Sequence, residues 1–417
     1  MARPRRLALG FFLAVAVAGV AAYLLRTETP KRTAPQFQRG VNGDLVNNWG
    51  TIAELMADPE ALEIFPDWRR TVTPAMFKAL ADEGFDFIRL PVDPGPALAY
   101  GPGPDQDRLI DGIRILSETA LDAGLKIIVD LHPLPRGEEV GGMESILGEH
   151  WPDYVALVQR IAEKLDGLPP DRTAFELLNE PSFDCDGVYA GAPPKWPAMQ
   201  AELHAAARKG APDLAIVLTG ACWGQANALA SLDPALIPDD NVIWTFHSYT
   251  PYSYTHQGAI WTEAPQKYLG NLPYPPSLMT PETAAKVIAE AEARMAAAEG
   301  IADTEAITQA VEDYVATPDS AIADEIVVAA RWADDHGIPR ERLLLGEFGA
   351  LHTVDGVTQP MEWYHAFLSA KRQASEEAHI GWAVLSWAGG MGVAMPGDPD
   401  RRLSPDTCRA LGLPCGN

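Results

Sequence analysis

Eight short apolar segments with β-strand character alternate with helical segments along this chain, and this alternation constrains its fold most. Several strand segments are almost continuously apolar, which is typical of strands covered on both faces in a parallel sheet. Eight strand–helix units with right-handed crossovers predict a closed (β/α)8 TIM barrel, and a doubly wound open sheet is the alternative. The predicted strands are 39–42, 85–92, 126–132, 174–179, 215–219, 242–249, 343–348 and 382–387.

The segments between the strands carry helix start and stop signals. Thr73 and Pro74 form an N-cap followed by a first-turn proline, and Gly84 ends that segment. The connection between strands six and seven is unusually long, from residue 250 to residue 342, and its first third is rich in Tyr, Trp and Pro. A loop at the carboxyl end of a barrel strand faces the active site. We therefore interpret this segment either as one wall of a substrate cleft or as a packed structural insertion.

The first residues of the chain differ in character from the rest. Arginines at positions 3, 5 and 6 precede an uncharged apolar run over residues 7–25. This pattern is typical of an export signal, and the run is also about long enough to span a bilayer. We predict a signal peptide or N-terminal membrane anchor over 1–33 and one catalytic barrel over 34–417. The expected location is periplasmic, extracellular or membrane-anchored and facing outside the cytoplasm.

Export bears on the four cysteines, because an oxidising compartment permits disulfides. Cys185 and Cys222 each follow a predicted strand, and Cys408 and Cys415 lie close together near the C-terminus, so we predict the pairs 185–222 and 408–415. The net charge of −25 argues against a nucleic-acid partner, since Lys and Arg must neutralise phosphate. A neutral polysaccharide is compatible with this charge. No His/Cys spacing indicates a zinc site, and we expect a monomer without metal or cofactor.

Polar or aromatic side chains stand where six of the predicted strands end. The carboxyl ends of barrel strands meet at one face, so these side chains are expected to converge there. Burying unpaired polar groups costs free energy, and such a convergence therefore indicates a functional site. The candidates are Arg89, His132, Asn179, Glu180, His247, Tyr249, Glu347 and Trp387.

Two carboxylates in this set suggest a reaction. Hydrolysis of a glycoside needs one carboxyl group to protonate the leaving oxygen and another to attack the anomeric carbon or activate water. Glu180 ends the fourth predicted strand and Glu347 ends the seventh, so they can face each other across the barrel mouth. A separation of about 5–5.5 Å would imply retention of configuration. The alternative is that each is a salt-bridged structural glutamate.

The chain resembles glycoside hydrolase family 5, the cellulase family A group, from about residue 40 to residue 387. Leu178-Asn179-Glu180-Pro181 looks like the acid/base motif of that family, and Gly346-Glu347-Phe348-Gly349 looks like its nucleophile motif. The resemblance implies a retaining enzyme with Glu180 as acid/base and Glu347 as nucleophile. Arg89, His132, His247, Tyr249 and Trp387 each fall where the family places a functional residue.

Physical chemistry suggests a supporting role for each of these residues. Asn179 can bind the sugar 2-hydroxyl, a contact that strengthens in the transition state. Arg89 can keep Glu347 ionised, because a nearby cation lowers the pKa of a carboxylate. Tyr249 can donate a hydrogen bond to Glu347. The two histidines, His132 and His247, can contact sugar hydroxyls or orient the carboxylates.

Two tryptophans bear on the substrate. Trp387 offers a flat ring for a sugar face, and Trp49 is either a platform in the cleft or a core residue. The segment 43–49 and the long 250–342 connection both depart from the commonest family pattern. We expect a β-1,4-glucan as substrate, with mannan, β-1,3-glucan or the cell's own exopolysaccharide as alternatives. An envelope protein that binds carbohydrate without catalysis is the remaining alternative.

Overall fold

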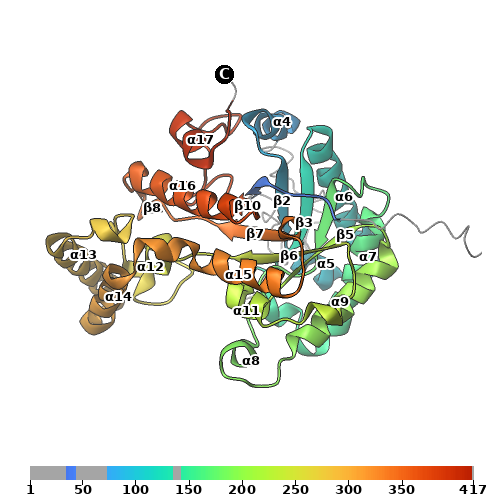
Figure 1. The fold of residues 1–417 in the computed structure, drawn as a ribbon, viewed down its shortest axis with the longest axis horizontal. Coiled ribbons are helices and arrows are strands. Elements are labelled where there is room, and N and C mark those ends of the chain that lie inside the picture. The colour runs from blue at the N-terminus through green and yellow to red at the C-terminus, as the bar shows by residue number, and fades with distance from the viewer. Residues whose placement is uncertain (1–33, 44–72, 135–141, 416–417) are drawn as a thin grey trace, which may run out of the picture. The chain divides into compact units, whose positions relative to one another are not determined.

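The computed structural model describes residues 34–43, 73–134 and 142–415. Eight parallel strands close into a barrel (Figure 1), which confirms the predicted (β/α)8 fold over an open sheet. Each strand pairs in parallel with its neighbours on both sides. In their order around the barrel the strands are β1 (Arg39–Asn42), β10 (Gly381–Val384), β7 (Leu343–Phe348), β6 (Val242–His247), β5 (Ala215–Thr219), β4 (Thr173–Glu176), β3 (Lys126–Leu131) and β2 (Phe87–Val92).

Helices surround this barrel, and their ends follow from local sequence. Helix α4 (Pro74–Glu83) begins where the Thr73 hydroxyl accepts a hydrogen bond from the Met76 amide. It ends at Gly84, whose φ of 105° is unfavourable for residues with a side chain. The other outer helices that cover the strands are α6 (Pro104–Asp122), α7 (Trp151–Leu165), α9 (Trp196–Gly210), α15 (Asp324–Asp335) and α16 (Met361–Glu377).

Apolar side chains fill one end of the barrel interior and pack around the Phe87 ring. We call this cluster the apolar floor. Phe37 closes this floor from below, with its ring centroid 5.0 Å from that of Phe87. A Cβ atom on Gly40 would lie 2.2 Å from the Phe87 ring, so only glycine fits at that point of β1. The floor is formed by Phe37, Phe87, Ile128, Ala174, Ala215, Val217, Ile243, Leu344 and Ala383.

Charged side chains replace apolar ones one layer further toward the carboxyl ends of the strands. Alternate residues of a strand point to the same side, so Phe87 and Arg89 share the interior, as do Ile128 and Asp130. On β4 the inward pair is Ala174 and Glu176. Arg89, Asp130 and Glu176 are fully buried. The barrel therefore changes from an apolar floor to a charged layer within two residues.

The long connection between β6 and β7 is largely helical. It contains α12 (Tyr252–Thr255), α13 (Pro281–Glu299), α14 (Thr304–Ala316) and finally α15, which packs beside the barrel. Figure 1 shows α13 and α14 together, projecting beyond the ring of barrel helices. Their facing sides are apolar, with Val287, Ala291 and Val311 buried. The outer part of the connection is thus a packed insertion, whereas its first residues lie by the barrel mouth, as described below.

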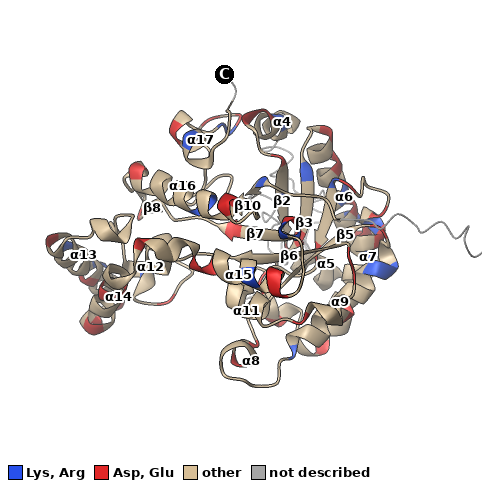
Figure 2. Cartoon of the chain, in the orientation of Figure 1, with Lys and Arg blue, Asp and Glu red and all other residues tan. Residues whose placement is uncertain are grey.

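Both predicted disulfides are present, Cys185–Cys222 and Cys408–Cys415. Acidic side chains are distributed over helices all around the barrel (Figure 2). The described residues form one compact unit. Within the described ranges no helix has both the length and the apolar character needed to cross a membrane. The predicted signal or anchor over 1–33 lies outside the described residues.

Candidate active site

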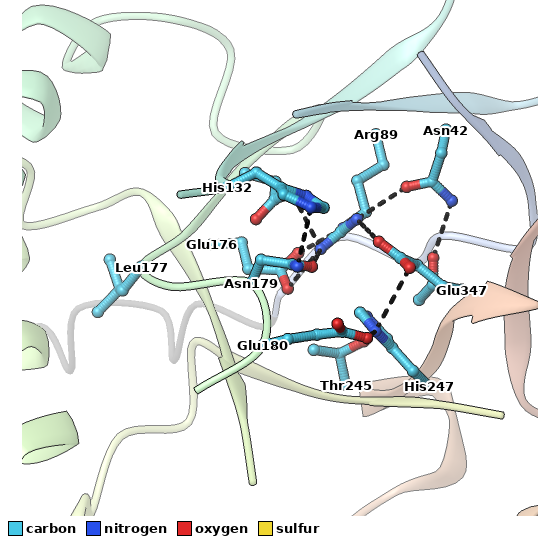
Figure 3. A network of polar contacts seen from close by, with 12 residues as sticks. Asn42, Arg89, His132, Glu176, Leu177, Asn179, Glu180, Thr245, His247 and Glu347 are labelled. Atoms are coloured by element: carbon cyan, nitrogen blue, oxygen red, sulfur yellow. Dashed lines mark hydrogen bonds and ion pairs between the residues drawn. The ribbon is translucent and has the colours of Figure 1, made fainter. Parts of the chain in front are cut away.

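Arg89 stands at the centre of the charged layer (Figure 3). Its Nε and Nη2 atoms donate to the two carboxylate oxygens of Glu176, at 2.7 and 2.9 Å. Nη1 donates to Glu347 Oε1 at 2.7 Å. A guanidinium is planar and presents its donors in a fixed fork, so these contacts fix the orientation of both carboxylates.

Two amides and a further carboxylate complete the surroundings of Arg89. Asn42 Oδ1 accepts from Nη1 at 2.8 Å, and Asn179 Oδ1 accepts from Nη2 at 2.7 Å. Asp130 Oδ2 lies 3.0 Å from Nη2. Asn42 is itself fixed, since its Nδ2 donates to the Gly346 carbonyl at 3.0 Å, next to Glu347. One buried cation is therefore shared by five residues, which come from β1, β3, β7 and from β4 and the segment that follows it.

Three members of this layer were missed from the sequence: Asn42, Asp130 and Glu176. Asp130 and Glu176 lie inside predicted strands, whereas the search for candidates was directed at strand ends; Asn42 ends the first predicted strand and was overlooked. A charged residue within an otherwise apolar strand, as in Val129-Asp130-Leu131, is a signal that would have found two of them.

His132 links Asp130 to Asn179. Its Nδ1 lies 3.0 Å from Asp130 Oδ2 and its Nε2 lies 3.1 Å from Asn179 Nδ2. The Asn179 amide cannot be reversed, because its oxygen already accepts from Arg89. Its nitrogen can only donate, so Nε2 accepts and the proton lies on Nδ1, facing Asp130. The second hydrogen of the Asn179 amide has no contact within this network.

Glu347 is held as a carboxylate. Oε1 accepts from Arg89, and Oε2 accepts from the Tyr249 hydroxyl at 2.7 Å. Burial acts to raise the pKa of Glu347, but the positive charges of His247 and Arg89 outweigh it and lower the pKa to about 2. Glu347 is therefore ionised at any pH near neutrality.

Glu180 lies in a different environment, four residues beyond the end of β4. About a quarter of its side chain is exposed. Its Oε1 lies 2.5 Å from His247 Nδ1, and the same nitrogen lies 3.5 Å from Glu347 Oε2. Burial lowers the pKa of His247, but the negative charges of Glu347 and Glu180 outweigh it and raise the pKa. His247 thus stands between one open and one buried carboxylate.

The two glutamates are close together. A ligand atom of Glu180, of His247 and of Glu347 all lie within 4.8 Å of one another. Among the described residues these are the one set of three His, Cys, Asp or Glu side chains close enough to hold a metal ion. A metal on His247 Nδ1 would have to replace its hydrogen bond to Glu180.

The structure corrects the expectation for Trp387. This residue follows the end of β10 by three positions, and its side chain is only 2% exposed. The Arg401 guanidinium lies over its ring, 5.3 Å from the centroid, and the Phe77 ring packs against it. Trp387 is thus a core residue with no open ring face for a sugar. Trp49 lies outside the described residues, so its role stays a prediction.

Comparison with known proteins gives a family assignment. The family model described as "Cellulase (glycosyl hydrolase family 5)" matches residues 56–390. The chain belongs to glycosyl hydrolase family 5. This confirms the resemblance drawn from the two glutamate motifs.

Relatives within the family have low sequence identity. Endoglucanase 3 of Fibrobacter succinogenes is 24% identical over 359 residues, which cover 81% of this chain and 48% of that protein. Cellodextrinase A of Ruminococcus flavefaciens is 32% identical over 195 residues, covering 44% of this chain and 53% of that protein. The chain thus matches about half the length of these relatives.

Solved structures agree with the fold. Thermotoga maritima Cel5A in complex with cellobiose superposes with a TM-score of 0.61 at 22% identity, covering 90% of this chain and 97% of that one. The cellulose synthase subunit Z of Clostridioides difficile gives a TM-score of 0.62 at 21% identity, covering 90% and 99%. At these identities the likeness supports the barrel alone.

Proposed function

We propose that this protein is a retaining glycoside hydrolase that cleaves β-glycosidic bonds in a polysaccharide, with a β-1,4-glucan as substrate. The observation that carries the proposal is the approach of Glu180 and Glu347 to within 4.8 Å. Carboxyl groups about 5–5.5 Å apart are typical of retaining enzymes, whereas inverting enzymes leave about 6.5–9.5 Å for a water molecule. The spacing of Glu180 and Glu347 is closer to that of retaining enzymes than to that of inverting ones.

In the first step Glu347 attacks the anomeric carbon while Glu180 gives its proton to the glycosidic oxygen. The bond from the anomeric carbon to that oxygen breaks, and the leaving sugar departs with the Glu180 proton. A glycosyl ester of Glu347 forms, which neutralises a carboxylate that Arg89 and Tyr249 had held ionised. The free amide hydrogen of Asn179 is available to the 2-hydroxyl of the sugar, a contact that strengthens in the transition state.

In the second step Glu180, now a carboxylate, removes a proton from water. The water oxygen attacks the anomeric carbon, the ester bond breaks, and Glu347 regains its charge. Glu180 suits this double role because it is partly exposed, and its ion-pair partner among the described residues is His247. His247, with its raised pKa, stabilises whichever glutamate is ionised.

Names of relatives support glucan as the substrate, since two of them are called endoglucanase and cellodextrinase. A second candidate is a β-1,3-glucan, because a protein called glucan 1,3-beta-glucosidase in Blumeria graminis is 26% identical over 161 residues. Mannan is a third, since Thermotoga maritima Cel5A is described in complex with mannotriose. Product analysis on cello-, laminari- and manno-oligosaccharides of equal length distinguishes them. Preference for the manno- or laminari-series would contradict the β-1,4-glucan assignment.

Two substitutions test the reaction itself. Glu347→Ala should abolish turnover of an aryl β-cellobioside, because no other group can form the glycosyl ester. Glu180→Ala should lower turnover of an oligosaccharide by about 10²–10⁴-fold, the usual contribution of a general acid. It should still release an activated aryl group in a burst, because such a leaving group needs no proton. Near wild-type activity of Glu347→Ala would contradict the proposal.

We also propose that the protein is exported, with residues 1–33 as a signal peptide or membrane anchor and the barrel working as a monomer. The basic start, the apolar run and two disulfides support an oxidising location. Cell fractionation with an antibody against the barrel tests this. A chain found in the cytoplasm with four reduced thiols would contradict it.

A further inference from the structure

Glu180 lies in a stretch of chain that regular secondary structure does not fix. Strand β4 ends at Glu176, and residues 177–184 form neither helix nor strand. A general acid has to reach the glycosidic oxygen at hydrogen-bond distance, and a misplacement of about 1 Å can cost about 10²-fold in rate. A support outside β4 must therefore hold Glu180 in place.

Two backbone hydrogen bonds join the loop of Glu180 to the loop that follows β5. The Trp223 amide donates to the Pro181 carbonyl at 3.1 Å, and the Cys222 amide donates to the Phe183 carbonyl at 3.0 Å. Pro181 is the residue directly after Glu180. The loop after β5 therefore supports the chain right beside the acid/base residue.

These two amides stand in an uncommon backbone conformation. Cys222 and Trp223 have left-handed φ angles of 49° and 61°, which residues with a side chain rarely adopt. Such conformations persist only where the surrounding structure holds them. The disulfide between Cys222 and Cys185 supplies a covalent hold, and Cys185 lies five residues after Glu180 on the same loop.

The loop after β5 also contacts the partner of Glu180. Gln225 pairs with His247 in a parallel bridge, and the Gln225 side chain accepts from the Tyr189 hydroxyl at 2.5 Å. A Cβ atom on Gly224 would lie 3.8 Å from His247 Cγ. His247 in turn lies 2.5 Å from Glu180 (Figure 3). The loop is thus wedged between the two members of this acid–histidine pair.

We propose that Cys185 and Cys222 are positioning residues for the general acid. Their disulfide fixes the loop after β5 between Glu180 and His247, and this loop holds Glu180 where it can protonate the leaving oxygen. The inference rests on the proposed function, in which Glu180 is that acid. The nucleophile is held separately, by Arg89 and Tyr249 from other strands. Loss of the disulfide should therefore impair acid catalysis and spare nucleophilic attack.

A series of aryl β-cellobiosides with leaving phenols of different pKa separates these two effects. The kcat/KM of each substrate reports the step in which the aryl group leaves, and a phenyl group needs a proton whereas a dinitrophenyl group does not. Replacing Cys185 and Cys222 with serine should lower kcat/KM for the phenyl glycoside by about 10- to 100-fold, the size expected for a misplaced catalytic group. The dinitrophenyl glycoside should keep nearly its full kcat/KM, so the dependence on leaving-group pKa becomes steeper.

The chain contains a matched control. Replacing Cys408 and Cys415 with serine should leave the dependence on leaving-group pKa as in the wild type. This variant keeps only the Cys185–Cys222 disulfide. Its reduction with dithiothreitol should steepen the dependence, and reoxidation should restore it. Circular dichroism of each sample verifies that the barrel stays folded.

A purely structural role gives a different result. Loss of folded protein lowers kcat/KM by the same factor for every substrate and leaves the slope against leaving-group pKa unchanged. An unchanged slope in the Cys185→Ser, Cys222→Ser variant, with an active wild type, would overturn the positioning role alone. A wild type that hydrolyses none of the aryl glycosides would overturn the proposed function and the positioning role with it.

Discussion

Glu347 shows how this fold sets the charge of one residue. Its carboxylate is buried, which by itself favours the protonated form, yet His247 and Arg89 lower its pKa to about 2. Tyr249 adds a hydrogen bond to the ionised form at 2.7 Å. A nucleophile must be ionised to attack, so activity that depends on Glu347 falls only when the pH approaches this low pKa.

Tyr249→Phe tests the contribution of that hydrogen bond. A hydrogen bond to a charged group is worth about 1.5–3 kcal/mol, so kcat/KM should fall about 10- to 100-fold. The pKa of Glu347 should rise, because a contact that favours the carboxylate is lost, and the acidic limb of the pH profile should move to higher pH. Rates on an aryl β-cellobioside across the acid range measure both effects.

The control is Tyr364→Phe. The Tyr364 hydroxyl is also buried, but it donates to the Met391 carbonyl at 2.9 Å rather than to Glu347. Its loss should leave the acidic limb in place. An acidic limb that does not move in Tyr249→Phe would show that the Tyr249 hydroxyl does not stabilise the ionised nucleophile.

Several candidate site residues could be proposed from sequence because they lie at or near strand ends. Glu180, Glu347, Arg89 and His132 were chosen because parallel strands bring their carboxyl ends together, and the structure brings all four into one network of polar contacts. Trp387 was misassigned because a sequence does not reveal which ring face a partner such as Arg401 covers. Asp130 escaped notice because the search was directed at strand ends. The lone charge in its apolar strand marks the residue, but its partner Arg89 lies on a different strand and cannot be read from local sequence.

Among the elements, α16 carries a group whose burial is unusual. Lys371 is fully buried, and its Nζ donates to Ser248 Oγ at 2.7 Å and to the Ile322 carbonyl at 3.0 Å. The Ser248 hydroxyl donates to Glu325. Ser248 stands between His247 and Tyr249, so this helix supports the strand end that carries two residues of the site.

Lys371→Met should change stability in a pH-dependent way. Burial lowers the pKa of Lys371 to about 8, an effect that Glu325 and Asp324 oppose, whereas its usual value is 10.5. Between these values the unfolded chain retains a proton that the folded chain has released. The wild type should therefore gain up to about 3 kcal/mol over the variant as pH rises through this range.

Denaturant unfolding of both proteins at neutral pH and near pH 10 measures this difference. Phe367→Leu, a neutral change in the core of the same helix, should give a difference from the wild type that does not vary with pH. A constant difference for Lys371→Met as well would mean that the folded chain does not lower the Lys371 pKa.

Elements of the barrel could be predicted because each strand carries a local apolar signal and some helices carry local start and stop signals, such as Thr73 and Gly84 at α4. Their ends were less predictable. The fourth strand was expected to reach residue 179, yet β4 ends at Glu176, because the following residues turn to place Asn179 against Arg89 and His132. Those contacts come from other strands, and local propensity does not contain them.

For the whole molecule, the two disulfides should contribute unequally to stability. Cys185 and Cys222 are 37 positions apart in sequence, and Cys408 and Cys415 are 7 apart. On the loop-entropy estimate, replacing the first pair with serines should lower the free energy of unfolding by about 4 kcal/mol and replacing the second by about 2 kcal/mol. Equilibrium unfolding of the two double variants measures this. A larger loss for the 408–415 pair would contradict the estimate.

The closed barrel could be predicted because eight strand–helix units repeat along the chain, and the structure confirms it. The placement of α13 and α14 did not, because their apolar faces fit several arrangements. The packing of α13 against α14 in the structure selects one of these arrangements.

The shared guanidinium of Arg89 has a consequence for redesign. Arg89 contacts the carboxylates of Asp130, Glu176 and Glu347 at once, so a proton gained by one changes the affinity of the others for protons. If Glu180 and Glu347 act as proposed, they cannot be grafted onto another barrel by themselves. A redesign would have to transfer Arg89 together with all three of these carboxylates. It would also have to keep the strand spacing that holds them in place.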